Sequence, residues 1–133
     1  MKAASAIAGI LSLAWMLLPF VGSEAAELVM FETRSCEWCA RWNEEVGVVY
    51  DRTAEGRRAP LRRVDLQRDR PEDLRRLGAI VYTPTFVLMD RGSEVGRILG
   101  YPGEGHFWGL LGALIGKLPE APLSTSLLWE HKR

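Results

Sequence analysis

Two cysteines separated by two residues, placed where an apolar stretch changes to a helical pattern, constrain the fold of this chain more than any other feature. Cys36 and Cys39 are the only cysteines in the sequence, and they follow the apolar run 28–31. From residue 37 to about residue 50, apolar residues recur at spacings of three and four, which predicts an amphipathic helix. We therefore expect Cys36 at the N-terminus of this helix and Cys39 one turn inside it.

This position suits a reactive thiol. Unpaired N–H groups and the positive end of the helix dipole favour the thiolate form of Cys36. A thiolate beside a second thiol can exchange disulfides, so Cys36 is predicted to attack a disulfide and Cys39 to resolve the mixed disulfide. Two other interpretations remain, a static bridge and a metal site. A structural zinc site needs about four ligands, and only His106 and His131 are left to join the cysteines.

The rest of the chain predicts an α/β fold with a mixed four-stranded sheet. The predicted strands are 28–32, 61–66, 85–89 and 94–99. We expect a loop at 51–60, a short helix from Pro71 through Leu77, and a last helix over 107–118. The element order is then β-α-β-α-β-β-α. The βα units require parallel strands and the later hairpin is antiparallel, so helices are expected on both faces of the sheet.

Four glycines recur through the last predicted helix: Gly105, Gly109, Gly112 and Gly116. Each costs about 1 kcal/mol of helix stability relative to alanine. Their periodic spacing predicts the close approach of another backbone.

The two ends of the chain are predicted to lie outside the folded domain. Residues 1–25 have one early lysine, an apolar centre and small residues before a cleavage point after Ala25, which is typical of a secretory signal peptide. An uncleaved membrane anchor is the alternative, since about 20 apolar residues can span a bilayer. Residues 26–118 form the predicted domain and 119–133 a polar tail. Both interpretations of the first segment predict export.

The charge balance points to no particular partner. Lys and Arg together number 17, and Asp and Glu together also number 17, so the formal net charge is zero and a nucleic-acid partner is not expected. Eight arginines between residues 57 and 76 form a basic middle segment. We expect this segment to be a solvated face, with docking to an acidic partner as the alternative.

A second motif supports the cysteine pair. The element order, with Cys-x-x-Cys at the first strand-to-helix junction, resembles the thioredoxin fold in its short, glutaredoxin-like form. In thioredoxin-like proteins a cis-proline precedes the third core strand beside the dithiol, and Thr83-Pro84-Thr85 occupies that place here. The resemblance implies that Thr83 and Pro84 bind substrate, with the backbone of Thr83 pairing with an extended segment. An ordinary edge-strand proline is the alternative.

A closer likeness covers most of the chain after residue 25. The segments that carry it are 30–32, 36–42, 59–66, 83–88, 94–98 and 100–104. They resemble the small periplasmic thioredoxin-like proteins of bacterial sulfur-oxidation (Sox) gene clusters, the SoxS/SoxW type. This resemblance implies a periplasmic thiol–disulfide oxidoreductase without a bound cofactor. Its substrate would be a protein with a reactive cysteine or disulfide, on the thiosulfate-oxidising Sox carrier complex, and its electron donor a membrane dithiol protein. The alternatives are a disulfide oxidant or isomerase, or a non-catalytic metal-carrying or Sox-interaction module.

Thioredoxin itself differs from this chain beside the cysteines. It carries a buried carboxylate six residues before its first cysteine, where this chain has Met30. Proton transfer at Cys39 therefore lacks that base, and Glu32, Glu37 or water are the candidates to replace it.

The two residues between the cysteines are the remaining candidates for a functional role. Glu37 is predicted to modulate the pair, because a carboxylate beside Cys36 disfavours the thiolate; a simple helix-start role is the alternative. Trp38 is expected to be exposed, either as a substrate contact or as a lid over the disulfide.

Overall fold

Four strands form a mixed sheet, as the sequence predicts, and the structure shows their order in the sheet to be β2-β1-β3-β4. The strands are β1 (Glu27–Glu32), β2 (Leu61–Asp65), β3 (Thr85–Asp90) and β4 (Ser93–Leu99). β1 is parallel to β2 and antiparallel to β3, and β3 is antiparallel to β4. The computed structural model describes residues 25–120. The expected signal peptide or anchor (1–25) and the tail (119–133) thus lie outside the described residues, except for their inner ends. Between residues 25 and 120, no helix is long and apolar enough to cross a membrane.

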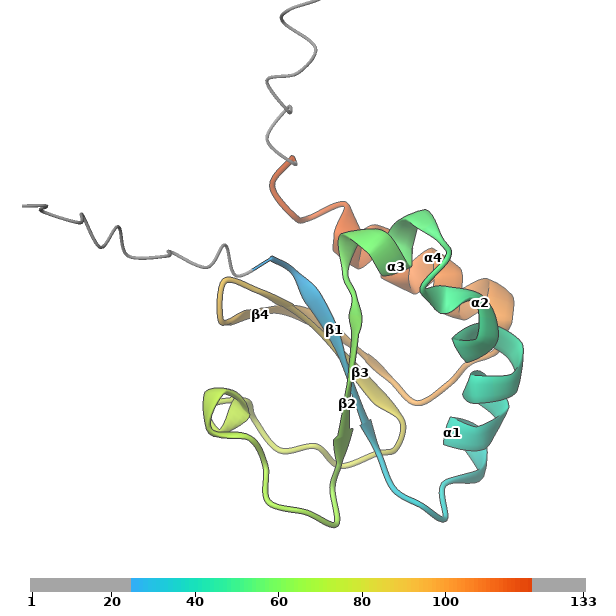
Figure 1. Cartoon of the computed structure of the whole chain (residues 1–133), viewed down its shortest axis with the longest axis vertical. Helices are drawn as coiled ribbons and strands as arrows, with labels where there is room; N and C mark the ends of the chain where they lie inside the picture. Colours follow the sequence, from blue (N-terminus) through green and yellow to red (C-terminus); the bar gives the residue numbers. More distant parts are fainter. Residues whose placement is uncertain (1–24, 121–133) are drawn as a thin grey trace, which may run out of the picture.

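The two central strands are buried on both faces, which explains their continuous apolar sequences. Successive side chains point to opposite faces, so alternate residues enter two separate apolar clusters. Leu28, Met30, Phe86 and Leu88 pack on the side of the helices. Val29, Phe31, Val87 and Met89 pack on the other side. Figure 1 shows the four α-helices on one side of the sheet and the yellow-green segment between β2 and β3 on the other.

The predicted helix over residues 37–50 is confirmed in extent, with one irregular turn in its middle. It consists of α1 (Glu37–Trp42), a π-helical turn η1 (Asn43–Gly47) and α2 (Val48–Tyr50). Trp42, Val46 and Tyr50 are spaced four residues apart, and all three are buried on one face across this irregular turn. The Trp42 ring packs against Phe86 and Phe107, with centroids 5.1 and 5.6 Å away. The last helix, α4 (Glu104–Ile115), covers the same cluster.

The prediction of a loop at 51–60 is wrong, because this stretch contains helix α3 (Ala54–Arg58). Thr53 caps it: its side-chain oxygen accepts a hydrogen bond from the Gly56 N–H at 3.0 Å. A capping threonine satisfies an N–H group that the first helical turn leaves unpaired. The capping signal was present in the sequence, but Gly56 and Pro60 obscured it.

The predicted helix from Pro71 through Leu77 shrinks to one 3₁₀ turn, η2 (Glu72–Leu74). Short helices are marginal without an apolar face, and Leu74 is the one side chain of this turn that is buried. The Arg70 side chain also donates a hydrogen bond to the Leu77 carbonyl at 3.0 Å, replacing backbone pairing there. The second face of the sheet is therefore covered by this turn and its flanking loops, with Leu66, Leu77 and Ile80 packed against it.

The predicted close approach of a backbone to the glycines of the last helix is wrong. Within the described part of the chain, a Cβ atom added at Gly105, Gly109 or Gly112 would have no heavy atom within 4 Å beyond the neighbouring backbone of the same helix. At Gly116 the nearest atom, 3.4 Å away, is a carbonyl oxygen of the same helical segment. These glycines weaken α4 without serving any contact that the structure shows.

Tyr50 gives the fold a specific sensitivity to alkaline pH. Its hydroxyl donates a 2.7 Å hydrogen bond to the Ala59 carbonyl, and the side chain is fully buried. Burial, followed by the nearby Glu55 and Asp51 carboxylates, raises the pKa of Tyr50 above its usual value. The unfolded chain therefore releases this proton at lower pH than the folded one. Above about pH 10 the free energy of unfolding must fall, by up to about 1.4 kcal/mol per pH unit for each such group.

Tyr50→Phe should lower the free energy of unfolding by about 1 kcal/mol at neutral pH, because one hydrogen bond is lost. Between pH 9 and pH 11, the free energy of unfolding of this variant should also fall less than that of the wild-type protein. Burial also raises the pKa of Tyr101, so part of the fall should remain. Urea unfolding at both pH values measures this, with Tyr82→Phe as the control because Tyr82 is 61% exposed. Equal falls in the wild type and Tyr50→Phe would contradict the prediction.

Candidate active site

The cysteine pair lies where β1 ends and α1 begins, as the sequence predicts. Cys36 is the N-cap residue of α1 and has an extended backbone, with φ −80° and ψ 104°. Its sulfur accepts a hydrogen bond from the Cys39 N–H at 3.1 Å, and its carbonyl accepts one from the Ala40 N–H at 3.1 Å. An N–H group of the first helical turn is thus directed at the sulfur of Cys36, where it would stabilise negative charge.

The two cysteines form a disulfide and differ sharply in exposure. Their Cα atoms are 5.2 Å apart. Cys39 is buried, with 2% of its surface exposed, whereas Cys36 is half-buried at the rim of a pocket. An external sulfur therefore reaches Cys36 more readily than Cys39.

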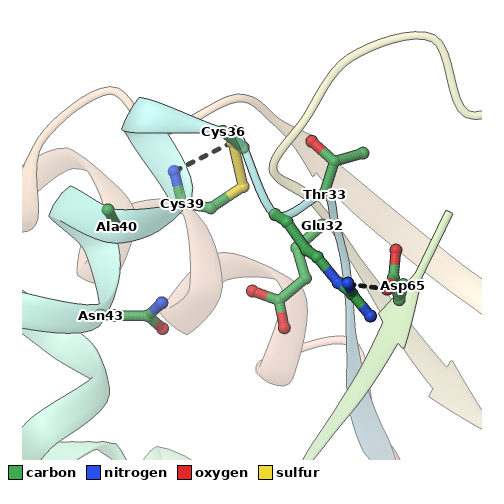
Figure 2. A pocket seen from close by; sticks show the side chains of 8 residues that line it. Glu32, Thr33, Cys36, Cys39, Ala40, Asn43 and Asp65 are labelled. Carbon is green, nitrogen blue, oxygen red and sulfur yellow. Dashed lines mark hydrogen bonds and ion pairs between the residues drawn. A yellow bond between two sulfur atoms is a disulfide. The ribbon is translucent and has the colours of Figure 1, made fainter. Parts of the chain in front are cut away.

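The pocket beside the disulfide brings together residues from three parts of the chain. It has a volume of about 260 Å³ and is lined by Glu32, Thr33, Arg34, Cys36, Cys39, Ala40, Asn43 and Asp65. Figure 2 shows the side chains of Glu32 and Asn43 pointing toward one another within it. Of the candidates for a base, Glu32 lines this pocket. Glu37 lies in the first turn of α1 with an exposed side chain and is not among the lining residues.

Trp38 is half-exposed, with 51% of its surface accessible, and it is the end of a chain of polar contacts. The Arg41 guanidinium lies 5.7 Å from the centre of its ring. Arg41 donates a 3.0 Å hydrogen bond to Glu45, and Glu45 accepts a 2.5 Å hydrogen bond from the Tyr101 hydroxyl. These two hydrogen bonds, the one from Tyr101 first, hold the pKa of Glu45 below its usual value. The charged Glu45 carboxylate therefore fixes the arginine that packs against Trp38.

Thr83 and Pro84 lie at the same end of the sheet as the disulfide, where β1 ends and β3 begins. In the β1–β3 pairing Phe31 is opposite Thr85, so the start of β3 is beside the end of β1. The Thr83–Pro84 peptide bond is cis, and Pro84 is buried. The Pro84 carbonyl accepts a 2.7 Å hydrogen bond from the Gly100 N–H, which connects the residue before β3 to the residue after β4.

Arg63 and Asn43 are the two residues near the site that sequence reasoning missed. Arg63, which was expected on a solvated basic face, has an exposed side chain, but it also lies opposite Met30 in the β1–β2 pairing and contacts Glu32. Other arginines of the segment are also engaged: Arg62 pairs with Glu27 and Asp73, and Arg75 pairs with Glu72. The imperfect alternation of β2 was the signal available, because it places the exposed Arg63 on the same face of the sheet as buried Met30.

Comparison with known proteins identifies the family. No protein-family model and no curated protein matches the chain. The solved structure of the periplasmic thioredoxin SoxS from Paracoccus pantotrophus, in its reduced form, is 45% identical; the match covers 68% of this chain and 96% of that one, with a TM-score of 0.64. The chain belongs to the SoxS-type thioredoxins. This confirms the resemblance inferred from the sequence.

Two more distant structures show the same fold. A thioredoxin-fold protein from Helicobacter pylori is 19% identical over 80% of both chains, with a TM-score of 0.58. Fasciola hepatica thioredoxin is 21% identical over 68% of this chain and 82% of that one, with a TM-score of 0.53. At these identities the likeness concerns the fold alone.

Family and geometry together define the chemistry of this SoxS-type thioredoxin. A cysteine pair with Cys-x-x-Cys spacing, joined as a disulfide in a thioredoxin fold, is a thiol–disulfide oxidoreductase site. Thioredoxin-like proteins act on protein substrates with disulfides. Among the described residues, no group of three or more His, Cys, Asp or Glu side chains is placed to hold a metal ion.

Proposed function

We propose that this SoxS-type thioredoxin reduces a disulfide of a protein substrate in the periplasm, with Cys36 as the nucleophile and Cys39 as the resolving cysteine. The observation that carries the proposal is the asymmetry of the pair. Cys36 is the N-cap residue at the pocket rim, and Cys39 is buried one turn inside α1. The Cys36 thiolate forms a bond to one substrate sulfur and releases the other; Cys39 then displaces the substrate and closes the disulfide.

Glu37 supports reduction as the direction of the reaction. It is the first residue of α1, directly beside Cys36. A carboxylate at that place opposes the Cys36 thiolate, and strongly oxidising pairs owe their potential to a stabilised thiolate. The proposed role of Glu37 is to keep this pair from acting as a strong oxidant.

The surface around the disulfide fits a polypeptide substrate. Large exposed apolar side chains flank this end of the sheet: Val81 and Tyr82 lie just before β3, Leu99 lies opposite Thr85, and Trp38 is in the first turn of α1. Within residues 25–120, neither the N–H nor the carbonyl of Thr83 takes part in a backbone hydrogen bond. Thr83 and Pro84 would then bind an extended substrate segment through the free backbone groups of Thr83, with Trp38 packing on the substrate beside the reacting sulfur.

The proposed location and partners are supported by the family and by the first residues of the chain. Residues 1–25 would direct export, leaving 26–118 as the thioredoxin-like domain and 119–133 as its tail. The solved SoxS structure is named as a periplasmic thioredoxin, which supports the periplasm as the site of action. The proposed substrate is a disulfide-linked cysteine of the thiosulfate-oxidising Sox carrier complex, and the proposed electron donor is a membrane dithiol protein.

A trapping experiment tests the substrate assignment. Cys39→Ser leaves the nucleophile but removes the resolving thiol, so a mixed disulfide with the substrate should accumulate on incubation with a periplasmic extract. Dithiothreitol should release the captured protein, and mass spectrometry should place the bond on Cys36 and on a Sox carrier subunit. The matched control, Cys36→Ser combined with Cys39→Ser, should capture nothing. Equal capture by the control would contradict the proposal.

A further inference from the structure

The resolving cysteine, Cys39, is buried near β1, and β1 carries Met30 at the position where thioredoxin has a buried carboxylate. Cys39 is 2% exposed, and fully buried Met30 of β1 belongs to the same apolar cluster. A thioether is a weak hydrogen-bond acceptor and does not take up a proton at neutral pH. Cys39 must nevertheless lose its thiol proton before it can attack the mixed disulfide, since the thiolate is the nucleophile. Another group has to receive that proton.

Glu32 presents a carboxylate to the pocket that Cys39 also lines. It is two residues after Met30 on β1, so its side chain leaves the strand on the same face, toward α1. It lines the pocket together with Cys39 and Asn43, and 22% of its side chain is exposed. Figure 2 shows its carboxylate directed into the pocket, on the side where Asn43 lies. A pocket of about 260 Å³ also has room for water, which occupies about 30 Å³ per molecule in the liquid.

Arg63 holds this carboxylate in place. One of its terminal nitrogens donates to both carboxylate oxygens of Glu32, at 3.1 Å each. Its other terminal nitrogen donates to the Asn43 side-chain oxygen at 2.7 Å. Its guanidinium lies 5.7 Å from the centre of the Trp42 ring, and one nitrogen lies 3.7 Å from the Met30 sulfur. The arginine opposite Met30 thus fixes a carboxylate that is displaced by two residues along the strand.

Asp65, the other carboxylate at the pocket, is less suited to this task. One of its oxygens accepts a 2.9 Å hydrogen bond from the Gln67 N–H, so it closes the turn after β2. Its second oxygen lies 3.9 Å from the guanidinium of Arg34 and 3.9 Å from that of Arg68. The charged side chains that line the pocket are Glu32, Arg34 and Asp65, with Arg63 bonded to Glu32.

We propose that Glu32 accepts the proton of Cys39 in the resolving step and that Arg63 is its positioning residue; this rests on the proposed roles of the two cysteines. In the mixed disulfide, Cys36 is bonded to a substrate sulfur and Cys39 is a thiol. The Cys39 proton passes to the Glu32 carboxylate, directly or across one water molecule. The Cys39 thiolate attacks the Cys36 sulfur, the Cys36–Cys39 bond forms, and the bond to the substrate breaks.

The electron pair of the broken bond leaves with the substrate as a thiolate, which takes up a proton. Glu32 returns its own proton to solvent or to that thiolate. Over both steps the reduced cysteine pair loses two electrons and two protons, and the substrate disulfide gains them. No other oxidant or reductant is required.

Single-turnover reduction of insulin disulfides by the dithiothreitol-reduced protein, stopped with acid, tests the assignment. Glu32→Gln should slow release of the mixed disulfide about 10-fold or more at pH 7, where water is the remaining acceptor. The deficit should shrink toward pH 9.5, because an ordinary thiol loses its proton unaided near pH 8.5. Arg63→Gln should show a smaller deficit with the same pH dependence. Asp65→Asn, which keeps the turn-closing oxygen, should behave as the wild type.

The first step serves as the internal control. In the Cys39→Ser background, Glu32→Gln should form the mixed disulfide at the rate of Cys39→Ser alone, because Glu32 acts only on Cys39. Slowing of that step, a deficit that is the same at every pH, or a larger effect of Asp65→Asn would overturn the role of Glu32. None of these results would contradict the proposed function. The proposed function has its own test and fails if Cys36→Ser retains activity.

Discussion

Replacing Cys36 by serine is expected to reduce the disulfide-reducing activity of the protein to the level measured without protein. The serine hydroxyl has nearly the size of the thiol, but it is not ionised at neutral pH and cannot form a disulfide. Cys39 cannot take over the attack, because it is 2% exposed and an external disulfide cannot reach it. Insulin reduction with dithiothreitol as the electron source, followed as turbidity, measures the loss.

Ser35→Ala is the matched control for that experiment. Ser35 is the exposed residue directly before Cys36, and its substitution leaves both sulfurs and the start of α1 unchanged. It should retain the wild-type rate. Thermal unfolding of reduced wild type and of Cys36→Ser should give the same midpoint, which separates loss of the nucleophile from loss of the fold. Full activity in Cys36→Ser would instead mean that the cysteines form a static bridge and that the nucleophile lies elsewhere.

The position of the cysteine pair could be predicted because every step depends on neighbouring residues. The run 28–31 is apolar without a break, and the helical spacing starts directly after the cysteines. The hairpin of β3 and β4 follows from its turn residues, and the two βα units require the parallel pair. The order of elements along the chain, the mixed character of the sheet and the helix that carries the disulfide were therefore accessible from local patterns.

The surroundings of the pair were not accessible, because they depend on pairing register. Arg63 meets Glu32 because β2 pairs with β1 so that Arg63 is opposite Met30. A shift of one residue would turn that arginine to the other face of the sheet. The register cannot be read from the local sequence. The contact of Arg63 with Glu32 was therefore not predicted, and the choice between Glu32, Glu37 and water stayed open.

The glycines illustrate the same limit from the side of packing. Gly56, placed in a predicted loop, packs against backbone: a Cβ atom there would lie 1.9 Å from the Tyr50 carbonyl oxygen. That oxygen cannot easily move, because it accepts hydrogen bonds from the Thr53 N–H at 3.0 Å and from the Thr53 hydroxyl at 2.7 Å. Three of the periodic glycines that the sequence made conspicuous, Gly105, Gly109 and Gly112 of α4, have open space instead among the described residues. Periodicity reveals which face of a helix a residue occupies, but not what lies opposite.

Gly56→Ala is therefore expected to be strongly destabilising and Gly112→Ala stabilising. The first must push α3 away from Tyr50, which should cost about 3 kcal/mol or more and lower the melting temperature by roughly 12 °C or more. The second removes the entropic cost of a glycine in a helix where, among residues 25–120, nothing beyond the neighbouring backbone of α4 lies within 4 Å of the new methyl group. It should gain about 0.5–1 kcal/mol. Thermal and urea unfolding of both oxidised variants measure the two effects.

The opposite signs make this pair of substitutions a test of packing rather than of helix propensity. Both glycines lie in helices, so propensity alone predicts that both alanine variants are more stable than the wild type. Only the space around each Cβ distinguishes them. Equal stabilisation by the two changes would show that α3 does not sit against the Tyr50 carbonyl in solution. The capping of α3 by Thr53 would then also be in error, since the same turn places both contacts.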